Sequence, residues 1–255
     1  MLSFNSDSTV PGLGAVDESD IVRFIPTALG AATSGTFEMY FDGSDVGLTT
    51  NGEDLDGLAL LDDGTLLISV AGSFAVDGLS GVDEDILRFT PISLGDNTSG
   101  TWSFYFDGST VALNTASTED ITGLYSEAVN GSIFMTTLGA FSVAGVSGDG
   151  ADIFICHPST LGQNNTTCTF TMFWDGSAFG YGSESMDAFN IATNQIVSSA
   201  IPFTTYDPRD VNDVIIEGED SFDWETDETE MEPEEPEEEE VEVLDETLYL
   251  PIVVR

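Results

Sequence analysis

The sequence predicts an all-β fold assembled from repeated four-stranded antiparallel units. Three observations carry this prediction. The tetrapeptide Phe-Asp-Gly-Ser at Phe41 recurs at Phe106 and, as Trp-Asp-Gly-Ser, at Trp174, so the chain repeats after 65 and then 68 residues. Each repeat contains short apolar runs separated by turns rich in Gly, Asp and Ser, which is typical of strands in all-β proteins. One run per repeat also carries a large apolar residue at every second position, which is the period of a β-strand.

Four strands are expected in each repeat. The first follows an acidic loop, as at 86–89, and the second is an aromatic run that ends in an Asp-Gly turn, as at 101–106. The third and fourth, as at 57–61 and 65–70, are joined by the turn at 62–64, which reads Asp-Asp-Gly. Such short runs, separated by turn residues, favour antiparallel hairpins.

The second strand has one packed face. Because successive side chains of a strand point to opposite faces, every second residue shares a face, and burying each large one contributes roughly 1.5–3 kcal/mol. On the other face Tyr40, Tyr105 and Phe173 share one recurring position, which could line a ligand surface or pack between repeats. The predicted core positions of this strand are Phe37, Met39, Phe41, Trp102, Phe104, Phe106, Phe170, Met172 and Trp174.

Four antiparallel strands repeated at a fixed interval are typical of the blades of a β-propeller. The hairpin 58–69, which reads LALLDDGTLLIS, resembles the inner hairpin of many bacterial propeller blades, and the resemblance extends over about residues 1–206. We therefore expect a β-propeller-like array of about three blades. A closed ring usually needs at least four. The array is therefore expected to be the C-terminal part of a longer chain, which we favour, or one half of a ring closed by two copies, or an open set of blades.

The chain divides into three parts by composition. Residues 217–246 contain 18 acids and no basic residue, so this stretch cannot bury enough apolar surface to fold and is predicted to be a disordered spacer. The predicted domains are a repeat domain at 1–213 with units at about 17–80, 83–146 and 149–206, an acidic linker at 214–247, and a short apolar motif at 248–255.

The charge balance excludes several partners. The chain has 47 acids against four Lys and Arg together, a formal net charge of −43. This charge repels the phosphates of nucleic acids and anionic membrane surfaces, and it attracts cations. Repulsion among the acids also destabilises the folded state unless ions screen it, so life in high salt is an alternative explanation for the composition.

Acids recur just before the first strand of each repeat. Closely spaced carboxylates in Gly-flanked loops are the hard oxygen ligands that Ca²⁺ requires, although the spacing does not match the EF-hand pattern. The alternative is that these acids cap turns and keep the loops soluble. The predicted calcium ligands are Asp17, Asp20, Asp83, Asp85, Asp149 and Asp152.

The two cysteines, Cys156 and Cys168, lie in one repeat and flank the loop between two predicted strands. A disulfide between them is expected and would fit an exported protein; the alternative is two free thiols. No catalytic residue is assigned. The single histidine, His157, has no G-x-S-x-G elbow to serve, and a zinc site with the two cysteines would lack the usual ligand spacing.

The C-terminal octet at 248–255 reads LYLPIVVR. It resembles a short signature of the form YLPxVxR on exported proteins of some filamentous bacteria, which implies an extracellular or cell-surface location. The alternative is an edge strand that folds back onto the domain. The first residues show no secretory signal, so the N-terminus is expected to be truncated, and no stretch has the roughly 20 apolar residues of a membrane span.

We therefore expect a secreted or cell-surface, non-enzymatic repeat scaffold, stabilised by calcium, that serves adhesion or binds a protein or carbohydrate. The loops remain alike between repeats, whereas the repeats of an enzyme usually diverge around the active site. The rival prediction is a calcium-dependent hydrolase or lactonase of the propeller type, with catalytic carboxylates at the rim. Self-association that closes a ring is a further expectation.

Overall fold

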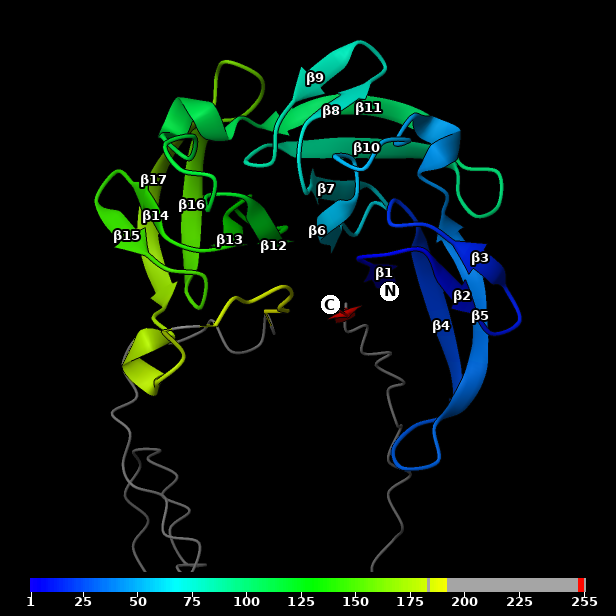
Figure 1. Ribbon diagram of the computed structural model, residues 1–255. Coiled ribbons are helices and arrows are strands. Elements are labelled where there is room, and N and C mark those ends of the chain that lie inside the picture. Colours follow the sequence, from blue (N-terminus) through cyan, green and yellow to red (C-terminus); the bar gives the residue numbers. More distant parts are fainter. Residues whose placement is uncertain (183, 192–251, 255) are drawn as a thin grey trace, which may run out of the picture. The chain divides into compact units, whose positions relative to one another are not determined.

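The computed structural model describes residues 1–182, 184–191 and 252–254, which all fall in one compact unit. Within these residues the strands form three four-stranded sheets and three two-stranded hairpins, joined by turns and three short 3₁₀ helices (Figure 1). The predicted all-β class with antiparallel sheets is thus confirmed. No helix in this part of the chain is long and apolar enough to cross a membrane. The predicted acidic linker at 214–247 lies outside the described residues.

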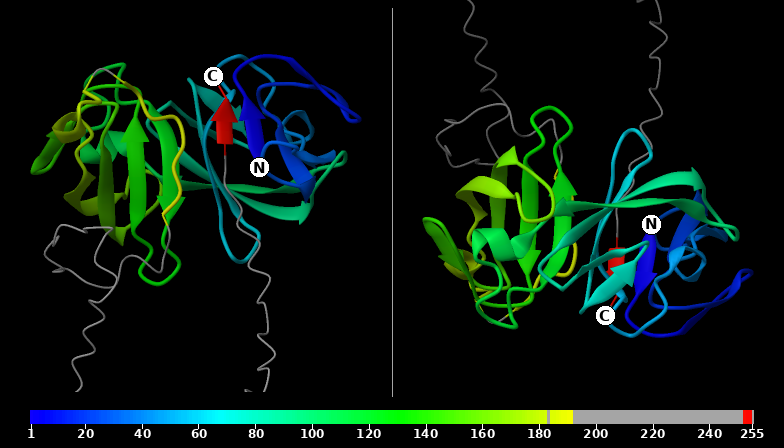
Figure 2. Two further views of the ribbon diagram at one scale, coloured as in Figure 1. Left: turned by 90° about the horizontal axis from the view of Figure 1, so that it is seen from below. Right: turned by 90° about the horizontal axis from the view of Figure 1, so that it is seen from above.

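The first sheet has the order β18-β1-β4-β5. Antiparallel pairing joins β1 to β4 and β4 to β5, whereas β18 runs parallel to β1, with Leu2 opposite Ile252 (Figure 2). Three residues of the C-terminal octet therefore form the edge strand of this sheet. The strands are β1 (Leu2–Phe4), β4 (Ile21–Ala28), β5 (Ser34–Phe41) and β18 (Ile252–Val254).

The second and third sheets have the same antiparallel order, β6-β7-β10-β11 and β12-β13-β16-β17. Their register also shifts at the same place, between Leu55 and Gly57 in β6 and between Ile121 and Gly123 in β12. A Cβ atom on Gly57 would lie 2.5 Å from Ser69 Oγ and 2.9 Å from the Leu124 side chain of the next sheet, so a larger residue there would force these side chains to shift. The strands are β6 (Leu55–Leu60), β7 (Leu66–Val70), β10 (Ile86–Ser93), β11 (Ser99–Phe106), β12 (Ile121–Ser126), β13 (Ile133–Thr137), β16 (Ile153–Thr160) and β17 (Thr167–Trp174).

A small hairpin precedes the third strand of each sheet, and the sequence analysis did not predict it. In the second hairpin the turn places Asp77 at φ +47° and Gly78 at φ +80°, the left-handed pair that a two-residue hairpin turn requires. The hairpins are β2 (Ser8–Val10) with β3 (Gly14–Val16), β8 (Phe74–Val76) with β9 (Leu79–Gly81), and β14 (Phe141–Val143) with β15 (Val146–Gly148).

The sheets are offset from the repeat units of the sequence. The last two strands of one unit pair with the first two strands of the next, so that β6 and β7 pair with β10 and β11. In the third unit, the described residues 184–191 contain no strand, and residues 192–206 lie outside the described part.

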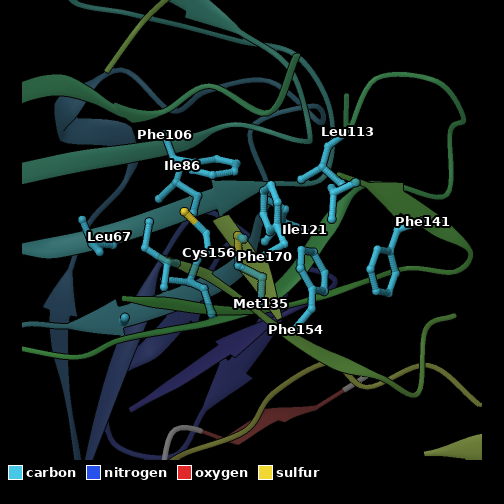
Figure 3. Packing of buried hydrophobic residues seen from close by; sticks show 14 residues of the cluster. Leu67, Ile86, Phe106, Leu113, Ile121, Met135, Phe141, Phe154, Cys156 and Phe170 are labelled. Carbon is cyan, nitrogen blue, oxygen red and sulfur yellow. The ribbon is translucent and has the colours of Figure 1, made fainter. Parts of the chain in front are cut away.

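Neighbouring sheets share their hydrophobic cores. One cluster joins Phe106 of the second sheet to Phe154 and Phe170 of the third (Figure 3), and another joins Phe41 of the first sheet to Phe89 of the second. All nine core positions predicted on the second strands belong to hydrophobic clusters, either between neighbouring sheets or on the first or third sheet alone, which confirms the two-residue period. On the opposite face Tyr40 and Tyr105 also pack against clusters, while Phe173 is 46% exposed.

Candidate functional site

The last acid of each acidic loop fastens two parts of its own sheet. Asp85 accepts a hydrogen bond from the Val82 amide at 3.0 Å through one carboxylate oxygen and from the Gly108 amide at 3.0 Å through the other. Asp20 and Asp152 do the same with equivalent amides, at 2.9 to 3.1 Å. All three side chains are buried. The recurrence of this acid is therefore explained by the backbone of the fold.

The other predicted ligands are not equivalent between repeats. The loop is a tight turn closed by the amide of its last acid, and the residue that accepts this bond is Asp17, Val82 or Asp149. Asp83 therefore corresponds to Glu18 and not to Asp17. Asp17 and Asp149 each accept the amide two residues ahead, at 2.9 and 3.0 Å, as turn-forming aspartates do.

The six predicted calcium ligands lie as three pairs in three separate loops. Among the described residues no group of three or more His, Cys, Asp or Glu side chains is arranged to hold a metal ion. Asp20, Asp85 and Asp152 also use both oxygens on amides, which leaves each with fewer lone pairs for a cation. Calcium binding by these residues stays a prediction.

Burial weakens Asp20 and Asp85 as acids. It raises the pKa of both Asp20 and Asp85 to about 6, although their backbone hydrogen bonds act in the opposite direction. Burial, a hydrogen bond from the protonated Glu84 to the Asp83 side chain and the charge of Asp85 raise the pKa of Glu84 to about 8. Ionising these loops at neutral pH therefore opposes folding.

A second recurring acid, Glu53 in the first repeat and Glu119 in the second, fixes the loop before the next sheet. Glu53 accepts the Thr49 and Thr50 amides at 2.8 and 2.9 Å and the Ala75 amide of β8 at 2.9 Å. Glu119 accepts the equivalent amides, including that of Ser142 in β14. Burial raises the pKa of each glutamate, but these hydrogen bonds outweigh it, so both pKa values lie below the usual value.

Acidic side chains crowd around a cleft beside the first sheet. The cleft has a volume of about 270 Å³ and is lined by Asp7, Asp17, Glu18 and Asp54 together with neutral polar groups. Burial, followed by the charges of Glu18 and Asp17, raises the pKa of Asp54 to about 6. The cleft is thus a place where a cation would relieve repulsion.

The residues with the features of a ligand site line a different cleft, which we call the inter-sheet cleft. It has a volume of about 400 Å³, and its walls come from the first, second and third sheets and from residues 189–190. Leu60 is 43% exposed there, so the cleft presents apolar surface to solvent. The lining residues are Met1, Tyr40, Leu58, Ala59, Leu60, Leu61, Asp62, Gly64, Leu124, Tyr125, Ser126, Phe189 and Asn190.

Tyr125 is one of two tyrosines that line the inter-sheet cleft, the other being Tyr40. The Tyr125 ring packs edge-on against Phe134 at 5.7 Å between centroids. Burial, together with the charges of Glu127 and Asp62, raises the pKa of its phenol, so the hydroxyl stays protonated well above neutral pH. An aromatic face, a hydroxyl donor and a carboxylate acceptor beside aliphatic walls are the usual components of a small-ligand site. Sequence reasoning named Tyr40 but missed Tyr125, because the two come together only through sheet packing.

Cys156 and Cys168 form a disulfide on neighbouring strands, with 5.3 Å between their Cα atoms. The equivalent residues in the second sheet are Phe89 and Gly100, and a Cβ atom on Gly100 would lie 2.4 Å from the Phe89 ring. The first sheet has the same pair, Phe24 and Gly35. The third sheet therefore replaces a ring packed on a glycine by a covalent bond.

The remaining candidate groups have structural partners. His157 lies 3.0 Å from the hydroxyls of both Ser132 and Thr171, one at each ring nitrogen. The disulfide removes the thiolates that a zinc site with His157 would need. Arg23 pairs with Glu38, and Arg88 pairs with Asp63 at 3.3 Å, as expected for rare cations in an acidic chain.

Comparison of the chain with protein-family models, with curated proteins and with solved structures finds no match.

Proposed function

We propose that the protein is a secreted or cell-surface, non-enzymatic scaffold of propeller-type blades that binds a protein or carbohydrate ligand in the inter-sheet cleft. The cleft carries the proposal, because groups from three sheets converge on one partly apolar space with Tyr125 and Asp62 at its surface. The net charge of −43 favours neutral or cationic ligands.

Two further observations support the proposal. The oxygens of the recurring carboxylates accept hydrogen bonds from backbone amides, as those of Asp85 and Glu119 do, and so stabilise the fold. The disulfide between Cys156 and Cys168 is typical of proteins that mature in an oxidising compartment, which supports export.

Ligand binding is tested by probing the full chain against arrays of neutral glycans and of neutral and basic peptides, followed by calorimetric titration of the hits. Tyr125→Ala should weaken binding at least tenfold and Asp62→Asn should weaken it less. Val129→Ala, at a residue 92% exposed between β12 and β13, is the matched control and should bind normally. If all three variants bind the ligand as tightly as the wild type, the cleft is excluded as the binding site. Conversion of the ligand to a product would exclude a non-enzymatic role.

A second candidate function is calcium binding, which we propose at the acidic cleft of the first sheet because four acids line it and burial, together with like charges, raises the pKa of Asp54. These acids are not arranged as metal ligands in the structure, so binding would require their side chains to move together. Calcium that binds only the folded state must raise the midpoint of thermal unfolding. We expect a rise that magnesium does not reproduce at equal ionic strength and that Asp54→Asn reduces. If calcium and magnesium raise the unfolding midpoint equally, the stabilisation is charge screening and not specific calcium binding. The hypothesis of a calcium-dependent hydrolase would then be refuted as well.

A further inference from the structure

Neighbouring sheets of this chain are joined by one contact that occurs twice. It forms between the turn that follows the last strand of one sheet, which we call the end turn, and the loop of the outer hairpin of the next sheet, which we call the hairpin loop. The end turns are 41–48, 106–113 and 174–181, and the hairpin loops are 29–33, 94–98 and 161–166.

The first such contact lies between the first and second sheets. The Asp42 amide donates to Thr98 Oγ1 at 2.9 Å, and the Thr98 amide donates to Asp45 Oδ2 at 2.8 Å. Trp102 Nε1 donates to the Val46 carbonyl at 2.9 Å. Leu94 of the hairpin loop packs into the core cluster that contains residues of both sheets.

The second contact repeats this arrangement between the second and third sheets. The Asp107 amide donates to Thr166 Oγ1 at 2.9 Å, and Thr110 Oγ1 donates to the Thr166 carbonyl at 2.9 Å. The Asn164 amide donates to Asp107 Oδ2 at 2.7 Å, and Leu161 packs into the shared cluster. A threonine and a leucine of the hairpin loop thus bind each end turn.

The third end turn has the same internal structure, but no hairpin loop among the described residues covers it. Asp175 Oδ1 accepts from Ser177 Oγ at 2.7 Å and from the Ala178 amide at 3.0 Å, as Asp107 accepts within the second end turn. Its apolar side chains are nevertheless in solvent, since Phe179 is 66% and Tyr181 is 56% exposed. The residues equivalent to Tyr181 in the other two end turns, Leu48 and Leu113, are fully buried.

The first hairpin loop is the complementary surface. Thr33 Oγ1 donates to the Gly30 carbonyl at 2.6 Å, the same bond that Thr98 makes to Gly95 at 2.8 Å. Gly30 and Gly95 also share a left-handed backbone, at φ +88° and +96°. The loop therefore has its binding conformation already, yet Leu29, the counterpart of the packed Leu94, is 75% exposed.

We infer that the end turn 174–181 of one copy docks on the hairpin loop 29–33 of a second copy. The Asp175 amide would donate to Thr33 Oγ1 of the second copy, and Leu29 would cover Phe179 and Tyr181. The second copy is the occupant indicated because one chain carries both halves of a contact that it already makes twice. The contact is also nearly free of charge, since the loop has no charged side chain at neutral pH and the turn has only Asp175.

Such a contact is head-to-tail, and two copies close on each other by making it twice when one is rotated by half a turn relative to the other. It does not depend on the inter-sheet cleft or on its ligand. Repulsion between two highly acidic chains opposes association, so added salt should strengthen it. We therefore expect a particle of twice the chain mass of 27.1 kDa, more populated at high ionic strength.

Sedimentation velocity of the full chain over a range of concentrations tests this inference. Phe179→Asp and Leu29→Asp each place a charge on an exposed residue of one half of the contact, so each should abolish the dimer while leaving the circular dichroism spectrum unchanged. Val129→Asp, at a residue 92% exposed outside both surfaces, should leave the dimer intact.

Mixing the two monomeric variants gives the decisive result. The Phe179→Asp chain keeps an intact hairpin loop and the Leu29→Asp chain keeps an intact end turn, so an equimolar mixture should form a dimer that neither variant forms alone. A folded wild-type chain that stays monomeric at every concentration and salt, or a dimer that both variants retain, would overturn the inference. A monomer in which Phe179 resists labelling by hydroxyl radicals would show that another segment of the same chain covers the end turn, and would overturn it equally.

Discussion

The disulfide of the third sheet can be exchanged for the aromatic pair of the other two sheets. We predict that Cys156→Phe combined with Cys168→Gly restores the arrangement seen at Phe89 and Gly100, in which the ring lies over the glycine. The neighbouring core residue is Phe170, which is smaller than its counterpart Trp102, so the cluster can admit the new ring.

The sizes of the expected stability changes follow from the loop length and the contact distances. Closing a loop between cysteines 12 residues apart stabilises the fold by about 3 kcal/mol through the unfolded chain. In a domain of this size that corresponds to a fall of about 6–12 °C in the melting temperature when the wild type is reduced. Cys156→Phe alone should be worse than the double variant, because its ring would meet the Cβ atom of Cys168. The equivalent distance in the second sheet is 2.4 Å. Overpacking of this kind costs about 1–3 kcal/mol.

Thermal unfolding followed by circular dichroism, with and without reductant, measures all three proteins. The wild type should lose stability on reduction, and the double variant should be insensitive to it. The double variant should also melt above Cys156→Phe even though it removes one more side chain. If Cys156→Phe melts at or above the double variant, the ring does not occupy the space over residue 168 and the proposed equivalence of the two pairs is wrong.

Three further outcomes follow from the carboxylates and the ion pairs. Asp85→Asn leaves one of two backbone amides without its acceptor and should cost about 1–3 kcal/mol of unfolding free energy by urea titration, with or without calcium. The control Asp96→Asn, at an exposed residue outside the acidic cleft, should change the unfolding free energy little. Because the pKa values of Asp20 and Asp85 are raised to about 6, the folded chain holds protons that the unfolded chain releases, so stability at fixed ionic strength should rise as the pH falls from 7 towards 4. Glu119 has a lowered pKa, so its contribution is present above the unfolded value and is lost on further acidification; a melting temperature that only falls below pH 7 would contradict this sign. Arg88→Ala breaks an exposed ion pair and should cost less than about 1 kcal/mol by the same urea titration, and a larger loss would mean that the pair is not simply a surface contact.

Local patterns predicted the strands well. The alternation through Phe37, Met39 and Phe41 requires only that a strand has one packed face, and the structure buries or partly buries each of these side chains. The turn at 62–64 is likewise set by residues next to each other in the chain, with Thr65 donating its amide to Asp63 at 2.9 Å. Features that depend on neighbouring residues were therefore accessible from the sequence.

The pairing of strands that lie far apart in the chain could not be predicted from the sequence. The sequence shows that strands repeat, but it does not show which repeat supplies the partner of β7, because the choice of β10 depends on a chain reversal through the small hairpin β8–β9. The inter-sheet cleft has the same origin. Tyr40 and Tyr125 lie far apart in the sequence, and only the packing of three sheets brings both to one cleft.

The role of the recurring acids could not be predicted from the sequence for a different reason. A buried aspartate in a loop before a strand has the same sequence signal whether its oxygens face a cation or two amides. What distinguishes Asp85 is the amide of Gly108, which belongs to the Asp-Gly turn at the far end of β11. A recurring acid accompanied by a recurring Asp-Gly turn is thus the signal that could have indicated the structural role.

The equivalence of the sheets also has a consequence for the gene. Asp85 and Asp152 occupy the same place before β10 and β16, and both bind the same two kinds of amide. A crossover between the codons of these two residues would delete residues 86–152 and join the end of the hairpin β8–β9 to β16. β7 could then pair with β16, which would complete a sheet with the strand order of the originals. The opposite crossover would add a sheet. Unequal recombination can therefore lengthen or shorten this chain in whole sheets without creating an unpaired strand, so copy number can vary between relatives while every junction stays intact.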